Sequence, residues 1–169
     1  MKKIFVLLLI SCTLLSCGQE KSDATTTYIF IRHAEKDLSN PANNNPALTP
    51  AGLVRAQRWA HIIDSIASNV DLVYSTDYDR TISTAKPVAD QFDLKIQKYK
   101  ASKLYSKSFR EKTKGKTVVV VGHSNTTPIF INKIIGKDTY TDIADDDYSK
   151  LFIVTMKDDE IIDRTHSFR

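Results

Sequence analysis

The chain has 169 residues, of which 41% are hydrophobic and 26% charged, and these values fit one globular domain of ordinary size. Its formal net charge is +4, from 24 basic and 20 acidic residues. This excess is too small to indicate nucleic-acid binding, so we expect no nucleic-acid partner.

Residues 1–16 have the pattern of a signal peptide. Lys2 and Lys3 precede an apolar run over residues 4–10, which is too short for a membrane-spanning helix. Leu14, Leu15 and Ser16 then precede Cys17, the arrangement at which bacterial lipoproteins are cleaved. We expect cleavage before Cys17 and lipidation of that residue; the alternative is an ordinary secretory signal with an incidental cysteine.

Polar residues 17–26 then form a lipidated tether, and residues 27–169 form the folded domain. Because Cys12 is removed and Cys17 carries lipid, the mature domain has neither a disulfide nor a free thiol. We expect the protein on a membrane of the bacterial cell envelope outside the cytoplasm, on the periplasmic side or at the surface.

Within the domain, strands and helices alternate. A β-prone run predicts a strand over 27–32, a loop follows over 36–50, and Thr49 and Pro50 begin a helix over about 51–68. The later segments are a strand over 70–74, a helix over 80–91, a short strand over 94–96, a helical segment over 102–112, a strand over 117–121, a helix over 125–135, and a final strand pair over 151–156 and 160–164. This order predicts an α/β domain with a mostly parallel sheet covered on both faces, whose site lies beyond the carboxyl ends of the strands.

Three short polar pieces follow three of these strands: residues 31–36, 75–81 and 122–125. They supply two imidazoles, His33 and His123, and two guanidiniums, Arg32 and Arg80. Gathered at one sheet edge, these groups make a phosphate site that contains a nucleophile, and they predict phosphoryl transfer through a phosphohistidine.

Together the pieces resemble the histidine phosphatase superfamily, which has the phosphoglycerate-mutase-like fold. Arg32-His33 resembles its first motif, with Ala34 replacing the usual glycine; residues 75–81 with Ala85 resemble the second motif, and residues 122–125 the third. The likeness spans nearly all of the mature chain and is greatest to small one-domain bacterial members. It implies a three-layer α/β/α sandwich.

The resemblance also implies a role for each site residue. His33 is the nucleophile, held by a hydrogen bond to a main-chain carbonyl, and Arg32 and Arg80 grip the phosphoryl oxygens. His123 supplies a further donor, and Asn125 with the amides of its helix N-terminus assists in binding phosphate. No metal and no cofactor are expected.

The proton donor for the leaving group has several candidates. Glu35, next to the first motif, is the first choice, although it could instead pair with Lys36 or Arg80. Other candidates are Asp77, Asp79 and the run Asp145, Asp146 and Asp147. Larger family members have an acid on an insertion after the second motif, and neither Asp90 nor Asp93 is a recognisable equivalent of it. A phosphoramidate such as phosphohistidine has a leaving group that needs little protonation, so an acid is not required for every substrate.

Other polar residues have simpler explanations. His61 is expected on an amphipathic helix and His166 in a polar tail, and the four histidines lack the spacing of zinc ligands. The lysines between Lys95 and Lys116 are expected on a solvated face; a second possibility is that they attract an anionic substrate.

The sequence therefore predicts an exported, membrane-anchored phosphatase. Its substrate is a phosphorylated small molecule or a phosphoprotein, attacked at a phosphomonoester or a phosphohistidine. Two alternatives stay open. One is a phosphoglycerate-type mutase, which the short loop over residues 36–50 and the exported location argue against. The other is an anion-binding lipoprotein without catalysis, against which the intact set of Arg32, His33, Arg80 and His123 argues.

Overall fold

The computed structural model describes residues 24–168. The predicted cleavage site and Cys17 lie outside this range. In chain order the elements are β1 (Thr26–Arg32), α1 (Pro50–Ile66), β2 (Leu72–Ser75), α2 (Asp79–Gln91), β3 (Ile96–Lys98), a 3-10 turn (Ala101–Lys103), α3 (Lys107–Thr113), β4 (Thr117–Gly122), α4 (Thr126–Ile135), β5 (Lys150–Lys157) and β6 (Glu160–Ser167). Within residues 24–168, no helix is both long and apolar enough to cross a membrane.

The strands form one six-stranded sheet in the order β3-β2-β4-β1-β5-β6. β3, β2, β4 and β1 run parallel, while β5 is antiparallel to β1 and β6 is antiparallel to β5. The helix crossovers explain the parallel part, and the tight turn between β5 and β6 explains why these two strands are antiparallel to each other.

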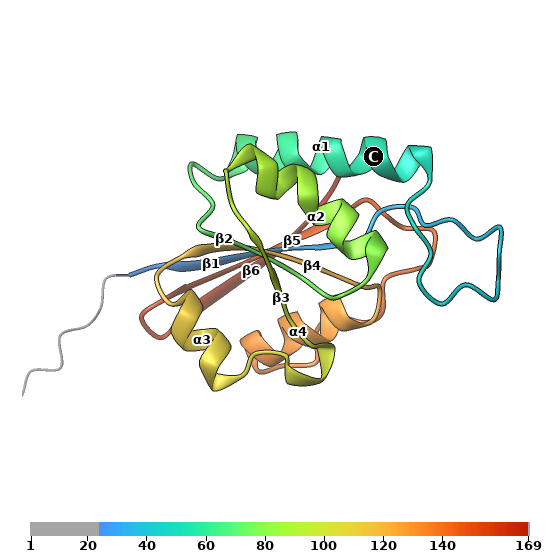
Figure 1. Cartoon of the computed structure of the whole chain (residues 1–169). Coiled ribbons are helices and arrows are strands. Elements are labelled where there is room, and N and C mark those ends of the chain that lie inside the picture. Colours follow the sequence, from blue (N-terminus) through green and yellow to red (C-terminus); the bar gives the residue numbers. More distant parts are fainter. Residues whose placement is uncertain (1–23, 169) are drawn as a thin grey trace, which may run out of the picture.

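Helices cover both faces of the sheet, as Figure 1 shows: α1 and α2 lie on one side, α3 and α4 on the other. Alternate residues of the central strands serve the two cores. Ile29, Ile31, Val119 and Val121 pack with Trp59 on the α1 side. Tyr28, Phe30, Val118 and Val120 pack with Phe109 and Phe130 on the other. The predicted three-layer α/β/α sandwich is therefore confirmed.

Most element bounds lie within two residues of the predictions, with two differences. The helical segment predicted over 102–112 is divided into the 3-10 turn and α3, because Tyr105 between them has a φ of +51°. His166 does not lie in a polar tail. It belongs to β6, opposite Leu151 of β5, and its side chain is exposed.

Strand register brings the three motifs to one level of the sheet. Arg32 is opposite Gly122 in the pairing of β1 with β4, and Ser75 is opposite Val121 in the pairing of β2 with β4. The next residues along, His33, Thr76 and His123, therefore emerge side by side at the carboxyl edge. The amide of His33 donates to the carbonyl of Gly122 at 2.9 Å, which continues the ladder one residue beyond β1.

Candidate active site

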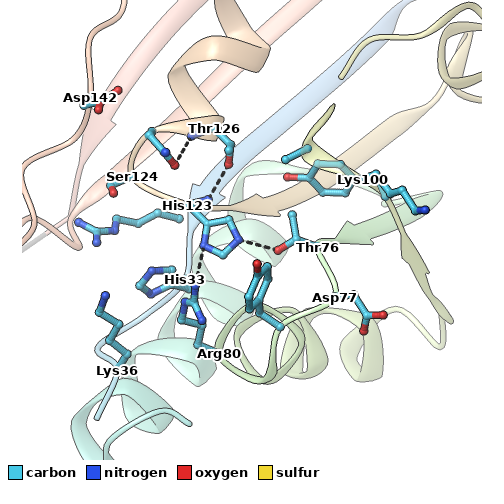
Figure 2. A pocket seen from close by; sticks show the side chains of 15 residues that line it. His33, Lys36, Thr76, Asp77, Arg80, Lys100, His123, Ser124, Thr126 and Asp142 are labelled. Carbon is cyan, nitrogen blue, oxygen red and sulfur yellow. Dashed lines mark hydrogen bonds between the residues drawn. The ribbon is translucent and has the colours of Figure 1, made fainter. Parts of the chain in front are cut away.

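A pocket of about 690 Å³ opens at this edge of the sheet (Figure 2). It is lined by residues from all three motifs and from neighbouring loops: Arg32, His33, Lys36, Thr76, Asp77, Tyr78, Arg80, Tyr99, Lys100, Ala101, His123, Ser124, Asn125, Thr126 and Asp142. Arg32, His33, Arg80 and His123, which the sequence predicted to converge, all contribute to this one pocket. Asn125 lines it as well.

His33 is almost completely buried, and its ring orientation is fixed by the main chain. Its Nδ1 lies 2.7 Å from the carbonyl oxygen of Ala34, so Nδ1 carries the proton and donates it. Nε2 is then left with a lone pair, which is the form needed for attack on phosphorus. The amide of Ala34 in turn donates to Thr84 Oγ1 at 2.9 Å. Ala34, the departure from the family glycine, is fully buried without disturbing this geometry.

Arg32 is buried beside His33 and is held along one edge by main-chain carbonyls. Its Nη1 donates to the carbonyl oxygen of Ala144 at 2.6 Å and lies 3.1 Å from that of Asp147 and 3.3 Å from that of Asp145. Its guanidinium carbon lies 4.4 Å from the centre of the Tyr148 ring. The buried Nε has no hydrogen-bond partner within the described residues.

Arg80 projects from the first turn of α2 and is held by side chains. Its guanidinium carbon lies 4.4 Å from the centre of the Tyr78 ring, and its Nη2 is 3.4 Å from His123 Nδ1. Its Nε and Nη1 are buried and find no acceptor among residues 24–168. Burial lowers the pKa of both arginines from their ordinary value. Three buried cationic N–H groups therefore lack acceptors at this pocket, and a bound anion would supply them.

A chain of hydroxyl groups fixes the proton on His123. Arginine cannot accept a hydrogen bond, so His123 Nδ1 faces Arg80 with its lone pair and Nε2 carries the proton. Nε2 donates to Thr76 Oγ1 at 2.8 Å, Thr76 donates to Thr81 Oγ1 at 2.9 Å, and Thr81 donates to the carbonyl of Tyr78. The rings of His123 and His33 lie 5.5 Å apart, centre to centre.

Both imidazoles are neutral near pH 7. Burial is the main cause that lowers the pKa of His33 to about 3, with Arg32, His123 and Arg80 adding to the shift and the Ala34 carbonyl opposing it. Burial also lowers the pKa of His123 to about 4, helped by the charges of Arg80, Lys36 and Arg32. A protein that holds its nucleophile neutral needs no separate base to activate it.

The start of α4 closes the third side of the pocket. Asn125 caps this helix, and its side chain accepts from the Thr126 amide at 2.8 Å. The preceding Gly122 allows a close approach, because a Cβ there would lie 2.6 Å from Thr127 Oγ1 and 2.9 Å from the Tyr99 hydroxyl. The helix N-terminus thus lies at the pocket, with the Thr126 amide capped by the Asn125 side chain.

The candidate acids lie in different places. Glu35 does not line the pocket; it pairs with Arg55 at 2.7 Å, rather than with Lys36 or Arg80. Asp77 lines the pocket and pairs with Lys98 at 2.7 Å, while Asp79 begins α2. Of Asp145, Asp146 and Asp147, the last two line a second pocket and none lines the first.

Several lining residues were not predicted from the sequence. Thr76 and Tyr78 lie inside the second motif, so their position beside Arg80 was a usable signal. Asp142 belongs to the irregular segment after α4, where no local pattern indicates proximity to the site. Of the lysines between 95 and 116, Lys100 lines the pocket; most of the others are exposed, as expected for a solvated face.

His61 is exposed on α1, away from the lining residues. Among residues 24–168, no group of three or more His, Cys, Asp or Glu side chains is arranged to hold a metal ion. The electropositive groups that face the pocket are side chains: Arg32, Arg80, Lys36 and Lys100.

Comparison with known families agrees with this geometry. Residues 28–104 match the family model of the histidine phosphatase superfamily (branch 1). This range contains the first two motifs, and the fold supplies the third beside them. Over these residues the chain is similar to the histidine phosphatase superfamily. No curated protein sequence matches the chain.

Solved structures share the fold at low sequence identity. The protein histidine phosphatase SixA complexed with tungstate has a TM-score of 0.66 and 14% identity, covering 83% of this chain and 96% of its own. Phosphoserine phosphatase from Entamoeba histolytica, in complex with 3-phosphoglyceric acid, has a TM-score of 0.65 and 16% identity, covering 85% and 98%. Mycobacterial glucosyl-3-phosphoglycerate phosphatase has a TM-score of 0.60 and 10% identity, covering 85% and 98%.

Proposed function

We propose that this protein is an exported, lipid-anchored phosphatase that works through a phosphohistidine on His33 and needs no metal. The observation that carries the proposal is the set of three buried guanidinium N–H groups without acceptors beside a neutral imidazole whose Nε2 is unprotonated. Leaving such donors unpaired costs about 1–3 kcal/mol each, and a phosphoryl group would supply the missing oxygens.

The reaction then has two displacements on phosphorus. His33 Nε2 forms the P–N bond while the bond from phosphorus to the leaving group breaks, and the leaving group takes the electron pair. Water next attacks phosphorus and releases a proton to the solvent, the P–N bond breaks, and the electron pair returns to Nε2. Arg32 and Arg80 stabilise the charge on the phosphoryl oxygens in both transition states.

His123 can donate a hydrogen bond to the phosphoryl group only when Nδ1 is protonated, because its Nε2–H already donates to Thr76 Oγ1. A phosphate dianion next to Nδ1 favours the charged imidazolium and offsets the burial that lowers the pKa. Binding of phosphate and protonation of His123 are therefore coupled, and His123 then adds a third cationic group to the site.

The substrate class is a phosphomonoester or a phosphohistidine. Of the acids predicted from the sequence, Glu35 pairs with Arg55 and Asp77 pairs with Lys98. Phosphoramidates and activated esters need little protonation of the leaving group, so they are favoured over alkyl phosphates. SixA and the phosphoserine phosphatase act, by their names, on phosphohistidine and phosphoserine, and both bond types are tested below.

The export and anchoring part of the proposal rests on residues 1–17. A basic start, a short apolar run and Leu14-Leu15-Ser16-Cys17 are the supporting observations. In a bacterial expression host, Cys17→Ser should leave uncut or soluble protein and abolish lipid labelling. Unchanged labelling would refute the anchor.

Activity is tested with the purified chain on three substrates: an aryl phosphate, an alkyl phosphate and phosphohistidine. We expect turnover of the aryl phosphate and phosphohistidine without added metal, unchanged by a chelator. Activity that disappears with the chelator and returns with zinc or magnesium would refute the metal-free mechanism. Turnover of none of the three by the wild type would favour an anion-binding protein.

A further inference from the structure

The segment between α4 and β5 approaches the site from outside the three motifs. β5 runs antiparallel to β1, with Leu151 opposite Ile31, so the residues that lead into β5 arrive at the edge where β1 ends. Residues 144–148 therefore lie beside Arg32 although more than 110 positions separate them in the chain.

This segment contacts Arg32 in two ways. The carbonyls of Ala144, Asp145 and Asp147 surround Nη1, at 2.6, 3.3 and 3.1 Å. The ring of Tyr148 lies under the guanidinium at 4.4 Å and is 6.3 Å from the ring of His33. One edge and one face of the guanidinium are thus occupied by protein, and the buried Nε is left without an acceptor.

The segment is itself firmly attached. The amide of Ile143 donates to the carbonyl of Ser124 at 3.0 Å, and Ile143 is buried in the core on the α4 side. The Asp147 carboxylate accepts from the amide and the hydroxyl of Ser149, at 2.9 and 2.6 Å. The carbonyl of Ser149 accepts from Phe168, so the segment is tied to the C-terminal end of β6.

Tyr148 also has support from the side of α1. Arg55 places its guanidinium carbon 6.0 Å from the centre of the Tyr148 ring, and Glu35 holds Arg55 through both its Nε and Nη2, each at 2.7 Å. Glu35 follows the nucleophile closely in sequence but contributes to the surroundings of this ring instead of the pocket lining.

We infer that Tyr148, with the main-chain carbonyls of residues 144–147, positions Arg32 so that its free N–H groups face the phosphoryl group. Tyr148 is a positioning residue, since it does not line the pocket and acts through Arg32. Without the ring, the guanidinium of Arg32 can rotate about the bonds of its flexible side chain, and the phosphate site loses its fixed geometry. This inference rests on the proposed function.

The test measures the dissociation constant of inorganic phosphate for the full chain in detergent. Tyr148→Leu should weaken phosphate binding about tenfold, the effect of losing a buried cation–π contact. Tyr148→Phe keeps the ring and should stay within about twofold of the wild type. If Tyr148→Leu does not fold, Tyr148→Met is the replacement. It also removes the ring, and the flexible methionine side chain adapts to the space that the ring leaves.

A double-mutant cycle separates positioning from general damage. In an Arg32→Leu background, Tyr148→Leu should weaken phosphate binding by less than about twofold, because the group it positions is absent. Tyr140→Leu is the matched control: Tyr140 is a half-buried tyrosine on the same segment, packed on Phe152 and bonded to Asp163. That variant should lower the thermal midpoint and leave the phosphate affinity unchanged.

Three results would overturn the inference. The first is an unchanged affinity in Tyr148→Leu while Arg32→Leu is weakened. The second is an equal loss from Tyr148→Leu in both backgrounds, which would indicate a structural effect independent of Arg32. The third is an unchanged affinity in Arg32→Leu itself, and that result alone would also remove the proposed phosphate site.

Discussion

The two ends of the pocket hold similar groups in different ways. At the end of β1, main-chain carbonyls orient His33 and Arg32, and both side chains are almost fully buried. At the ends of β2 and β4, side chains orient Arg80 and His123 through Tyr78 and Thr76, and the two residues are half-buried.

This difference indicates at which end the orientation of the catalytic groups depends on neighbouring side chains. Main-chain acceptors stay in place when a neighbouring side chain is changed, so His33 Nδ1 and Arg32 Nη1 keep their partners, and Tyr148 is the side chain at this end whose loss should affect Arg32. The other end relies on hydroxyl and aromatic groups that a single substitution removes.

Loss of the nucleophile should be the most damaging change at either end. His33→Ala should lower kcat/KM by roughly three orders of magnitude or more, because positioning alone does not replace a covalent nucleophile. His123→Ala should be less severe, since it removes stabilisation of charge and leaves His33 intact. Steady-state kinetics on an aryl phosphate measures both. Equal losses in the two variants would contradict the assignment of His33 as nucleophile.

The two arginines should differ in their effect on stability. Arg32→Leu and Arg80→Leu should each lower kcat/KM by roughly two to three orders of magnitude, as for the removal of donors to a transition-state oxyanion. Arg80→Leu should also raise the free energy of unfolding by about 1 kcal/mol in phosphate-free buffer, because two buried N–H groups without acceptors are eliminated.

Arg32→Leu should show no such gain, because the bonds from Nη1 to three carbonyls are lost with the charge. Chemical denaturation with and without phosphate measures both variants, and phosphate should stabilise the wild type more than either variant. A larger gain in Arg32→Leu than in Arg80→Leu would reverse the comparison of the two ends.

The lowered pKa of His33 predicts a loss of stability in acid. The unfolded chain takes up a proton on this residue near its ordinary pKa of about 6.5, whereas the native protein does so only near pH 3. Between these values the unfolded state binds more protons, so stability falls as the pH falls from 6.5 toward 3. The expected loss from His33 is about 2 kcal/mol at pH 5 relative to pH 7.

His33→Asn should flatten this part of the pH dependence in phosphate-free urea denaturation. His61→Asn is the control, because His61 is exposed on α1, and that variant should follow the wild-type curve. Parallel curves for the wild type and His33→Asn would mean that His33 titrates normally in the folded protein.

The smallest expected effect concerns the hydroxyl chain. Thr76→Val removes the acceptor for His123 Nε2 while keeping the side-chain volume, so His123 loses its fixed tautomer. We expect kcat/KM to fall about tenfold, the value of one hydrogen bond to an oriented catalytic group.

Thr127→Val is the matched control for Thr76→Val. Thr127 is buried in the first turn of α4, and its Oγ1 has no hydrogen-bond partner among the described residues. Valine there should leave activity unchanged and maintain or raise the thermal midpoint. A loss as large as that of Thr76→Val would show that the pocket is sensitive to any change nearby.

Much of the fold and the cationic part of the site could be predicted from the sequence. The alternation of strands and helices predicts a mostly parallel sheet, whose register brings Arg32, His33 and His123 to one edge, and Arg80 joins them from the start of α2. The acid next to the nucleophile was less predictable, because the direction of the Glu35 side chain beyond the end of β1 depends on Arg55 of a different element.

The contact of Tyr148 with Arg32 had no local signal at all. It depends on β5 being antiparallel to β1, which brings a loop near the end of the chain back to the motif near its start. Long-range contacts of this kind come from topology, and a short motif contains no information about them.

The most direct test of the account is to identify the phosphorylated residue. The wild type is mixed with a labelled substrate, quenched rapidly, and digested under alkaline conditions that preserve phosphohistidine before peptide mapping. The account predicts that the label is on His33, in an amount that matches the burst of the first turnover. The label should be completely absent in His33→Ala. Label on His123 or on a serine, in a His33→Ala variant that still turns over substrate, would contradict it.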